Sequence, residues 1–172
     1  MTKRTKKSMP KQNRIYMVRT ALALVLVAVF FAVGGGIIYV KNQTTTQTFV
    51  SDFMKMEFNY PAKLYAKSDP SSVTLSNPDI GGRISISKYG TNFMNVYSHV
   101  ENSIGRWKDK PTSIENFVGD FERGVVVNGE SKGEQYRIYY FVKDYTIYQF
   151  EANDPALFSD LDAIAKSFRI LE

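Results

Sequence analysis

Hydrophobic residues follow three different patterns along this chain. The first is an unbroken apolar run of 20 residues, Ala21 to Val40. As a helix it would be about 30 Å long, enough to cross the hydrocarbon core of a bilayer. After Val40 the apolar residues either alternate with polar ones, which is typical of strands, or recur at helical spacing. The pattern therefore predicts a membrane-spanning helix followed by a folded α+β part.

Alternation and β-forming residues predict several strands. In the first of them, Met56, Phe58 and Tyr60 alternate with Glu57 and Asn59. The loop signals are the residues 77–82, the pair Asn128-Gly129, and Lys143-Asp144, which is short enough for a tight antiparallel turn. The predicted strands are Met56–Pro61, Ser72–Ser76, Arg83–Tyr89, Ser113–Val118, Glu122–Val127, Gln135–Val142 and Tyr145–Ala152.

Helical spacing predicts two helices in the same part of the chain. One begins at Thr91 or Asn92, runs to about Trp107, and carries the apolar face Phe93, Val96, Val100, Ile104 and Trp107. The other follows an N-cap at Asp154 with Pro155 in the first turn. Its apolar stripe is Leu157, Leu161, Ile164 and Phe168, so Asp160 and Asp162 are expected to face solvent. Helices flanking consecutive antiparallel strands predict an α/β/α sandwich.

The distribution of charge indicates how the apolar run is oriented in the membrane. Seven of the 22 basic residues and none of the 17 acidic ones precede Ala21, so the part after the run carries a net charge of −2. A sequence pI near 9.3 would otherwise suggest nucleic-acid binding. The asymmetry instead favours a cytoplasmic N-terminus, because basic residues gather on the cytoplasmic side of membrane helices. We therefore expect a single-pass protein of the cell membrane with its C-terminal domain outside the cytoplasm, and no nucleic-acid partner.

The expected organisation has four parts: a basic cytoplasmic tail (1–20), a transmembrane helix (21–40), a polar linker (41–51) and an extracytoplasmic α+β domain (52–172). An alternative is a secretory signal peptide cleaved after Ala32-Val33-Gly34. The apolar run continues past Gly34, which favours an uncleaved signal-anchor. Ala28, Ala32 and Gly36 recur every four residues, and such a stripe would allow a homodimer through the helix, although small residues are common in membrane helices.

The two ends of the domain carry short motifs of a known kind. The opening, Met56-Glu57-Phe58-Asn59-Tyr60-Pro61, is similar to the short first strand of PsbP-like domains. The ending is similar too: a strand at 145–152, a helix, and the close Ile164-Ala165-Lys166-Ser167-Phe168. This resemblance covers about residues 52–172 and implies a central antiparallel sheet between helices. It also implies a role in binding other proteins or assisting assemblies, and it supplies no metal or cofactor residue.

Candidate chemistry is sparse. The chain has no cysteine, which excludes disulfides and thiolate chemistry. Its one histidine, His99, is expected at the edge of a helix face, and no zinc, calcium or phosphate-binding motif is present. We therefore expect no enzymatic activity and no cofactor.

Tyrosines are dense on the two strands that precede the last helix. Those that face away from the helices would form a binding platform, for which the candidates are Tyr139, Tyr145 and Tyr148, flanked by Arg137. The competing interpretation is that these tyrosines pack beneath a helix or loop. The sequence thus favours a non-catalytic accessory domain that contacts another envelope protein in an envelope or secretion assembly. A small-ligand or sensing domain, with a pocket between sheet and helix, is the alternative.

Overall fold

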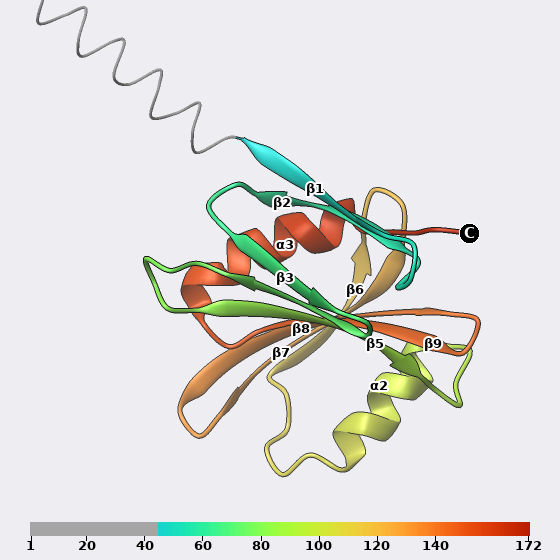
Figure 1. Cartoon of the computed structure of the whole chain (residues 1–172). Helices are drawn as coiled ribbons and strands as arrows, with labels where there is room; N and C mark the ends of the chain where they lie inside the picture. Colours follow the sequence, from blue (N-terminus) through green and yellow to red (C-terminus); the bar gives the residue numbers. More distant parts are fainter. Residues whose placement is uncertain (1–44) are drawn as a thin grey trace, which may run out of the picture. The chain divides into compact units, whose positions relative to one another are not determined.

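The computed structural model describes residues 45–172, which form a seven-stranded antiparallel sheet, a three-stranded sheet and two α-helices (Figure 1). The large sheet has the order β3-β4-β5-β9-β8-β7-β6, and every neighbouring pair is antiparallel. Its strands are β3 (Tyr65–Asp69), β4 (Ser72–Ser76), β5 (Arg83–Gly90), β6 (Ser113–Val118), β7 (Arg123–Ser131), β8 (Glu134–Lys143) and β9 (Thr146–Ala152).

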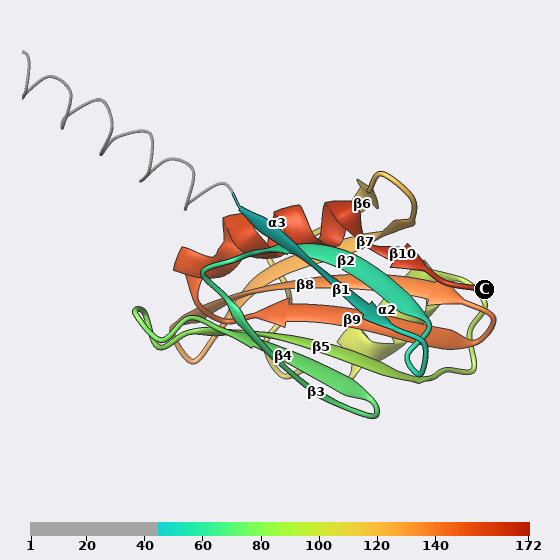
Figure 2. The same ribbon diagram turned by 45° about the horizontal axis from the view of Figure 1, so that its top comes forward.

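One face of the large sheet is covered by helix α3 (Phe158–Ser167) and by the small sheet (Figures 1 and 2). The small sheet has the order β1-β2-β10, with β1 (Thr46–Ser51), β2 (Met56–Pro61) and β10 (Arg169–Ile170). The main core lies between these layers and contains Phe58, Phe141, Phe150 and Phe168, whose rings contact one another.

Helix α2 (Val96–Gly105) lies on the opposite face of the large sheet, over β7 and β8. Its Val100 and Ile104 pack against Val125, Val127 and Tyr140 in a second, smaller core. The helix covers only this part of the face, and the neighbouring positions of β5 carry polar side chains such as Ser85 and Ser87. A helix on each side of an antiparallel sheet agrees with the predicted fold class.

The strongest sequence patterns are confirmed. In β2 the alternating Met56, Phe58 and Tyr60 are buried, and β4 and β6 have the predicted bounds. The predicted stripe of the last helix is also buried, with Leu157, Leu161, Ile164 and Phe168 all fully inaccessible. Asp154 caps this segment as expected, because its carboxylate accepts a hydrogen bond of 2.9 Å from the Ala156 N–H. The helix begins with a short 3₁₀ turn, Pro155–Leu157.

The prediction of a polar linker over residues 41–51 is wrong for its second half, because residues 46–51 form β1. This strand has few apolar residues because it lies at the edge of the small sheet, where its side chains are mostly exposed. Phe49 stacks on Phe58 at 5.0 Å between ring centroids, and Gln47 accepts a hydrogen bond of 2.7 Å from the Tyr60 hydroxyl. Strand β3 was missed for a similar reason, because all five of its residues are exposed and it pairs only through its backbone with β4.

Helix α2 begins later than predicted, at Val96 with Asn95 as its N-cap. Thr91 explains the difference: its hydroxyl accepts a hydrogen bond from the Phe93 N–H, which forms a local turn instead of a helical one. Its own N–H donates to the Tyr145 carbonyl at 2.8 Å, so the segment is held against the end of the sheet.

Both predicted hairpin turns shift along the chain. Strand β7 continues through Asn128-Gly129, and the β7–β8 turn is Lys132-Gly133, with φ of 56° and 84°. The β8–β9 turn is Asp144-Tyr145, with φ of 48° and 58°. Positive φ at both central residues is the type I′ geometry that matches the twist of antiparallel strands. Gly129 pairs with Tyr136 within the strand, and the Tyr136 side chain covers it so closely that it leaves no space for a Cβ.

The predicted transmembrane helix and the small-residue stripe at Ala28, Ala32 and Gly36 lie outside the described residues. Within residues 45–172, no helix is long and apolar enough to cross a membrane.

Candidate functional site

The four candidate surface residues do not form one exposed platform. Tyr139 and Tyr148 are 4% and 3% exposed and point into the main core, so the expectation that they contact a partner was wrong. The Tyr148 hydroxyl donates to the Met54 carbonyl oxygen at 3.1 Å, beneath the small sheet. The covering layer explains the error: α3 and the small sheet together bury this face of β8 and β9, which alternation alone could not indicate.

Arg137 belongs to a polar network that joins the sheet to α3. Its Nη1 lies 2.6 Å and 2.9 Å from the carboxylate oxygens of Asp162, and its Nε donates to Asn128 Oδ1 at 2.8 Å. The Tyr139 hydroxyl donates to the same Asp162 carboxylate at 2.7 Å. Burial and this hydrogen bond raise the pKa of Tyr139. The network is structural. Asp162 is partly exposed, as expected, and it also has these two partners in the sheet.

Asp160 was also expected to face solvent, and it is buried instead. It forms an ion pair with Lys63, whose Nζ lies 2.8 Å from Asp160 Oδ2. Lys63 belongs to the β2–β3 loop, so the pair connects that loop to the first turn of α3. Burial of an aspartate on a helix requires such a partner.

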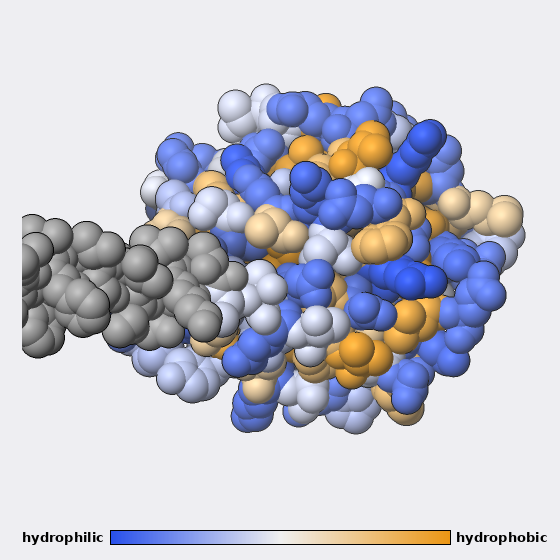
Figure 3. Space-filling model, turned by 90° about the horizontal axis from the view of Figure 1, so that it is seen from above, coloured by the Kyte–Doolittle hydropathy of each residue, from blue (hydrophilic) through white to orange (hydrophobic). Residues whose placement is uncertain are grey.

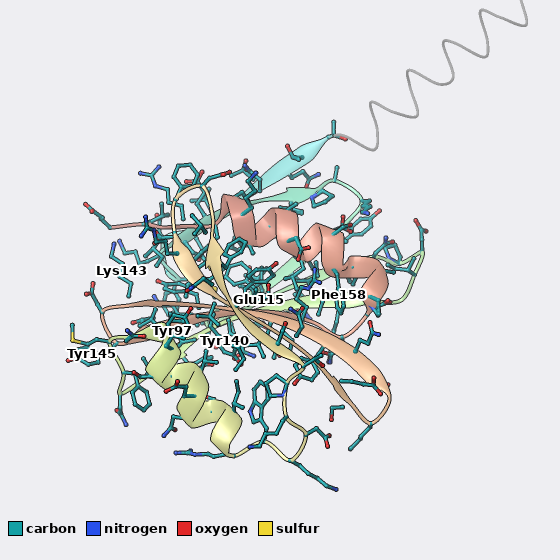
Figure 4. All side chains as sticks on the ribbon, turned by 180° about the vertical axis from the view of Figure 1, so that it is seen from behind. Tyr97, Glu115, Tyr140, Lys143, Tyr145 and Phe158 are labelled. Carbon is teal, nitrogen blue, oxygen red and sulfur yellow. The ribbon has the colours of Figure 1, made fainter. Side chains whose placement is uncertain are left out.

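Tyr145 is the one candidate tyrosine that remains available for contact. It is 52% exposed in the β8–β9 turn, and the bond from Thr91 N–H to its carbonyl brings the segment between β5 and α2 beside it. Met94 is 70% exposed in that segment, and Tyr97 on α2 is 36% exposed. Figure 4 places Tyr97 and Tyr145 at the same end of the domain, opposite the end that holds Phe158. We call Met94, Tyr97 and Tyr145 the apolar end.

His99 lies near the apolar end, among three aromatic rings. Its ring contacts Tyr89, Phe93 and Tyr140 at centroid distances of 6.0, 6.3 and 5.7 Å. Its Nδ1 lies 3.0 Å from Thr91 Oγ1, and its Nε2 lies 3.4 Å from Ser103 Oγ. Burial lowers the pKa of His99, because the cationic form loses hydration. The expected position of His99 at the edge of the helix face is confirmed, and its surroundings hold the ring in place.

A pocket of about 660 Å³ opens on the same side of the sheet, at the other end of α2. The loop that follows α2 supplies Trp107, Lys108 and Asp109, and the sheet supplies Tyr136, Ile138, Glu151 and Asn153. The β7–β8 hairpin forms a further wall with Ser131, Lys132 and Glu134.

Two contacts hold the walls of this pocket. The Trp107 ring meets Tyr136 edge to face at 5.9 Å, and Ser131 Oγ donates to Asp109 Oδ2 at 2.7 Å. The Tyr136 hydroxyl is buried and has no hydrogen-bond partner among the described residues. Burial and the nearby Asp109 raise the pKa of Tyr136, so its hydroxyl keeps its proton at neutral pH. No local pattern in the sequence indicates the residues of this pocket, because they come from separate elements.

A second hollow of about 680 Å³ adjoins the first and shares Glu134, Glu151 and Asn153 with it. Its other wall is the loop and strand at Gly81, Gly82 and Arg83. Both hollows mix acidic and basic side chains. Among the described residues, no group of three or more His, Asp or Glu side chains is arranged to hold a metal ion.

Comparison with known proteins supports the fold and leaves the function open. No family model matches the chain, and no curated protein has significant sequence similarity to it. The solution structure of cyanobacterial PsbP (CyanoP) from Synechocystis sp. PCC 6803 matches with a TM-score of 0.52 and 12% identity, over 73% of this chain and 92% of that chain.

A crystal structure of a protein from Bacteroides thetaiotaomicron VPI-5482 matches with the same TM-score and 13% identity. That match covers 73% of this chain and 48% of the other, so this chain spans about half of the Bacteroides protein. At these identities the likeness concerns the fold alone. The domain therefore has a PsbP-like fold, as its two ends suggested.

Proposed function

We propose that this protein is a non-catalytic binding domain, held outside the cytoplasm by an N-terminal membrane anchor, that contacts another envelope protein. The basic residues before Ala21 and the apolar run after it support the anchor. The negative net charge of the part after the run supports a separate, exported domain.

The proposed contact with a partner protein rests on the apolar end. Met94, Tyr97 and Tyr145 are large side chains left exposed together at one end of the domain. The most exposed of the other aromatic side chains stand singly, Phe53 in the β1–β2 turn, Tyr65 on β3 and Phe121 in the β6–β7 turn. The face of the domain that carries the small sheet and α3 shows hydrophobic groups interspersed among hydrophilic ones (Figure 3). Tyrosine and methionine are favoured at protein interfaces because they offer large contact area.

The test uses a photo-reactive phenylalanine analogue in place of Tyr145, in cells that make the full-length protein. We expect one discrete cross-linked product, identifiable by mass spectrometry. Tyr65 is the matched control, since it is 66% exposed on the outer strand β3 and lies outside the apolar end. Tyr145→Ala should also weaken the partner's affinity by about 2 kcal/mol if this side chain is central to the interface. Cross-linking of equal extent at both positions, or at neither, would contradict the proposal.

A second candidate function, binding of a small ligand, is favoured by the pocket beside Trp107. Its volume falls within the range of ligand sites, about 300–1,000 Å³. Trp107 is the only tryptophan of the chain, so its fluorescence reports on this pocket. A metabolite that both shifts the melting temperature and changes Trp107 emission, with no cross-linked product at residue 145, would replace the leading proposal.

A further inference from the structure

Strand β6 forms an outer edge of the large sheet, and this edge is unprotected. It pairs with β7 on one side, and no strand of residues 45–172 pairs with its other side. Edge strands that avoid association usually carry lysine, other charged residues or proline. Strand β6 (Ser-Ile-Glu-Asn-Phe-Val) contains no lysine or proline, and its one charged residue is Glu115. Two of its apolar side chains are exposed, Ile114 by 43% and Val118 by 68%.

The hydrogen bonding of the β6–β7 hairpin determines which residues direct their backbone groups outward. Gly119 N–H donates to the Glu122 carbonyl at 2.9 Å, so these opposed residues exchange bonds across the hairpin. Bonded and outward positions alternate along an antiparallel strand. The backbone groups of Ile114, Asn116 and Val118 therefore point away from β7. The two-residue turn between β7 and β8 leads to the same assignment of outward positions, because Ser131 and Glu134 are the opposed residues that close that hairpin.

We infer that two copies of this protein pair antiparallel through β6, about a two-fold axis at Asn116. In this register Asn116 faces Asn116 of the second copy, and each Ile114 faces a Val118. Outward N–H and C=O groups then meet at every one of these positions, so the two sheets become continuous. The exposed apolar residues cover each other twice, as a self-complementary interface requires.

The neighbouring register is less favourable. An axis at Glu115 would place two carboxylates directly opposite each other and would pair Ile114 with an amide, which is destabilising. The axis at Asn116 sets Glu115 against Phe117 instead. The other outer strand, β3, has Lys67 at its centre, in keeping with a protected edge. Tyr97 of the apolar end donates a hydrogen bond to Asn116 Oδ1, so the two surfaces adjoin. The pairing itself uses the backbone of β6 and does not depend on the proposed partner.

The chain contains no cysteine, which allows a test without background. At the proposed axis the two Cα atoms of residue 116 would lie about 5.5 Å apart, within the range of a disulfide. Full-length Asn116→Cys protein in native membranes should form a covalent dimer on mild oxidation. Glu115→Cys is the matched control: its copies would sit diagonally, about 7–8 Å apart, and should form little dimer.

Two more variants separate this pairing from random collision or from unfolding. Val118→Lys in the Asn116→Cys background should abolish the covalent dimer, while circular dichroism of the purified protein stays unchanged. Lys67→Cys, on the opposite edge, should not cross-link. The inference is overturned if folded Asn116→Cys protein yields no dimer, if Lys67→Cys yields as much, or if Glu115→Cys forms dimer more readily than Asn116→Cys.

Discussion

At the residue scale, Asp162 has a larger structural role than its place on the helix suggests. Its carboxylate accepts from both Arg137 and Tyr139, so α3 is joined to β8 by hydrogen bonds as well as by apolar packing. The Asp162 side chain itself is 42% exposed, and solvent weakens its attraction to Arg137. The buried Tyr139 hydroxyl is therefore the group that depends most on it.

We expect Asp162→Ala to lower the free energy of unfolding by about 1–3 kcal/mol, because it leaves the Tyr139 hydroxyl without an acceptor. Urea unfolding would measure the loss. Ser159→Ala, at an exposed position of the same helix, is the control and should change stability by less than about 0.5 kcal/mol. Equal effects from the two variants would mean that the hydrogen bond contributes nothing.

His99 makes stability depend on pH in a definite direction. Burial lowers its pKa in the folded state below the usual value near 6.5, so the unfolded chain binds the proton first as pH falls. Stability should therefore decrease from pH 7.5 to pH 5.5. His99→Gln should reduce this decrease, as measured by urea unfolding at the two pH values. An unchanged pH dependence in the variant would exclude His99 as its source.

At the scale of elements, the close pairing of β7 with β8 requires a glycine at position 124. A Cβ there would collide with the Tyr140 carbonyl oxygen and would lie 2.9 Å from the Phe141 ring. The oxygen belongs to the backbone of the central sheet and cannot rotate away.

Gly124→Ala should therefore destabilise the domain by about 1–3 kcal/mol, the usual cost of overpacking. Gly105→Ala is the matched comparison, because nothing lies within 4 Å of the new Cβ at this end of α2. It should be neutral or stabilising by up to about 1 kcal/mol. Thermal melting of both variants decides the point, and a tolerated Gly124→Ala would show that β7 can move away from β8.

At the scale of the whole molecule, the charge bias predicts which side of the membrane holds the domain. Single cysteines introduced by Ser8→Cys and Ser71→Cys lie before and after the apolar run. A membrane-impermeant maleimide should label residue 71 in intact spheroplasts, and it should label residue 8 only after lysis. The reverse pattern would contradict the orientation, and an intact mass that starts at Gly35 would favour the signal-peptide alternative.

Much of the fold follows from the sequence alone. Alternation in β2 and the stripe from Leu157 to Phe168 predicted buried faces correctly, because both elements have one face against a core and one toward solvent. Such elements show their periodicity in the order of residues. Strands β1 and β3 lack it because they lie at edges, where pairing is through the backbone and side chains remain exposed.

The candidate site depended on tertiary structure. Strand β8 carries tyrosine on both faces and β9 carries Tyr148, so the sequence determined that these strands form but not which face is covered. The small sheet and α3 decided this, by burying Tyr139 and Tyr148 and leaving Tyr145 exposed in its turn. The pocket beside Trp107 likewise joins residues from separate segments, and only the order of strands in the sheet leaves β6 at an outer edge. Periodicity within a segment indicates the strands and helices that are buried on one face, whereas the choice of the buried face depends on neighbours that are distant in the chain.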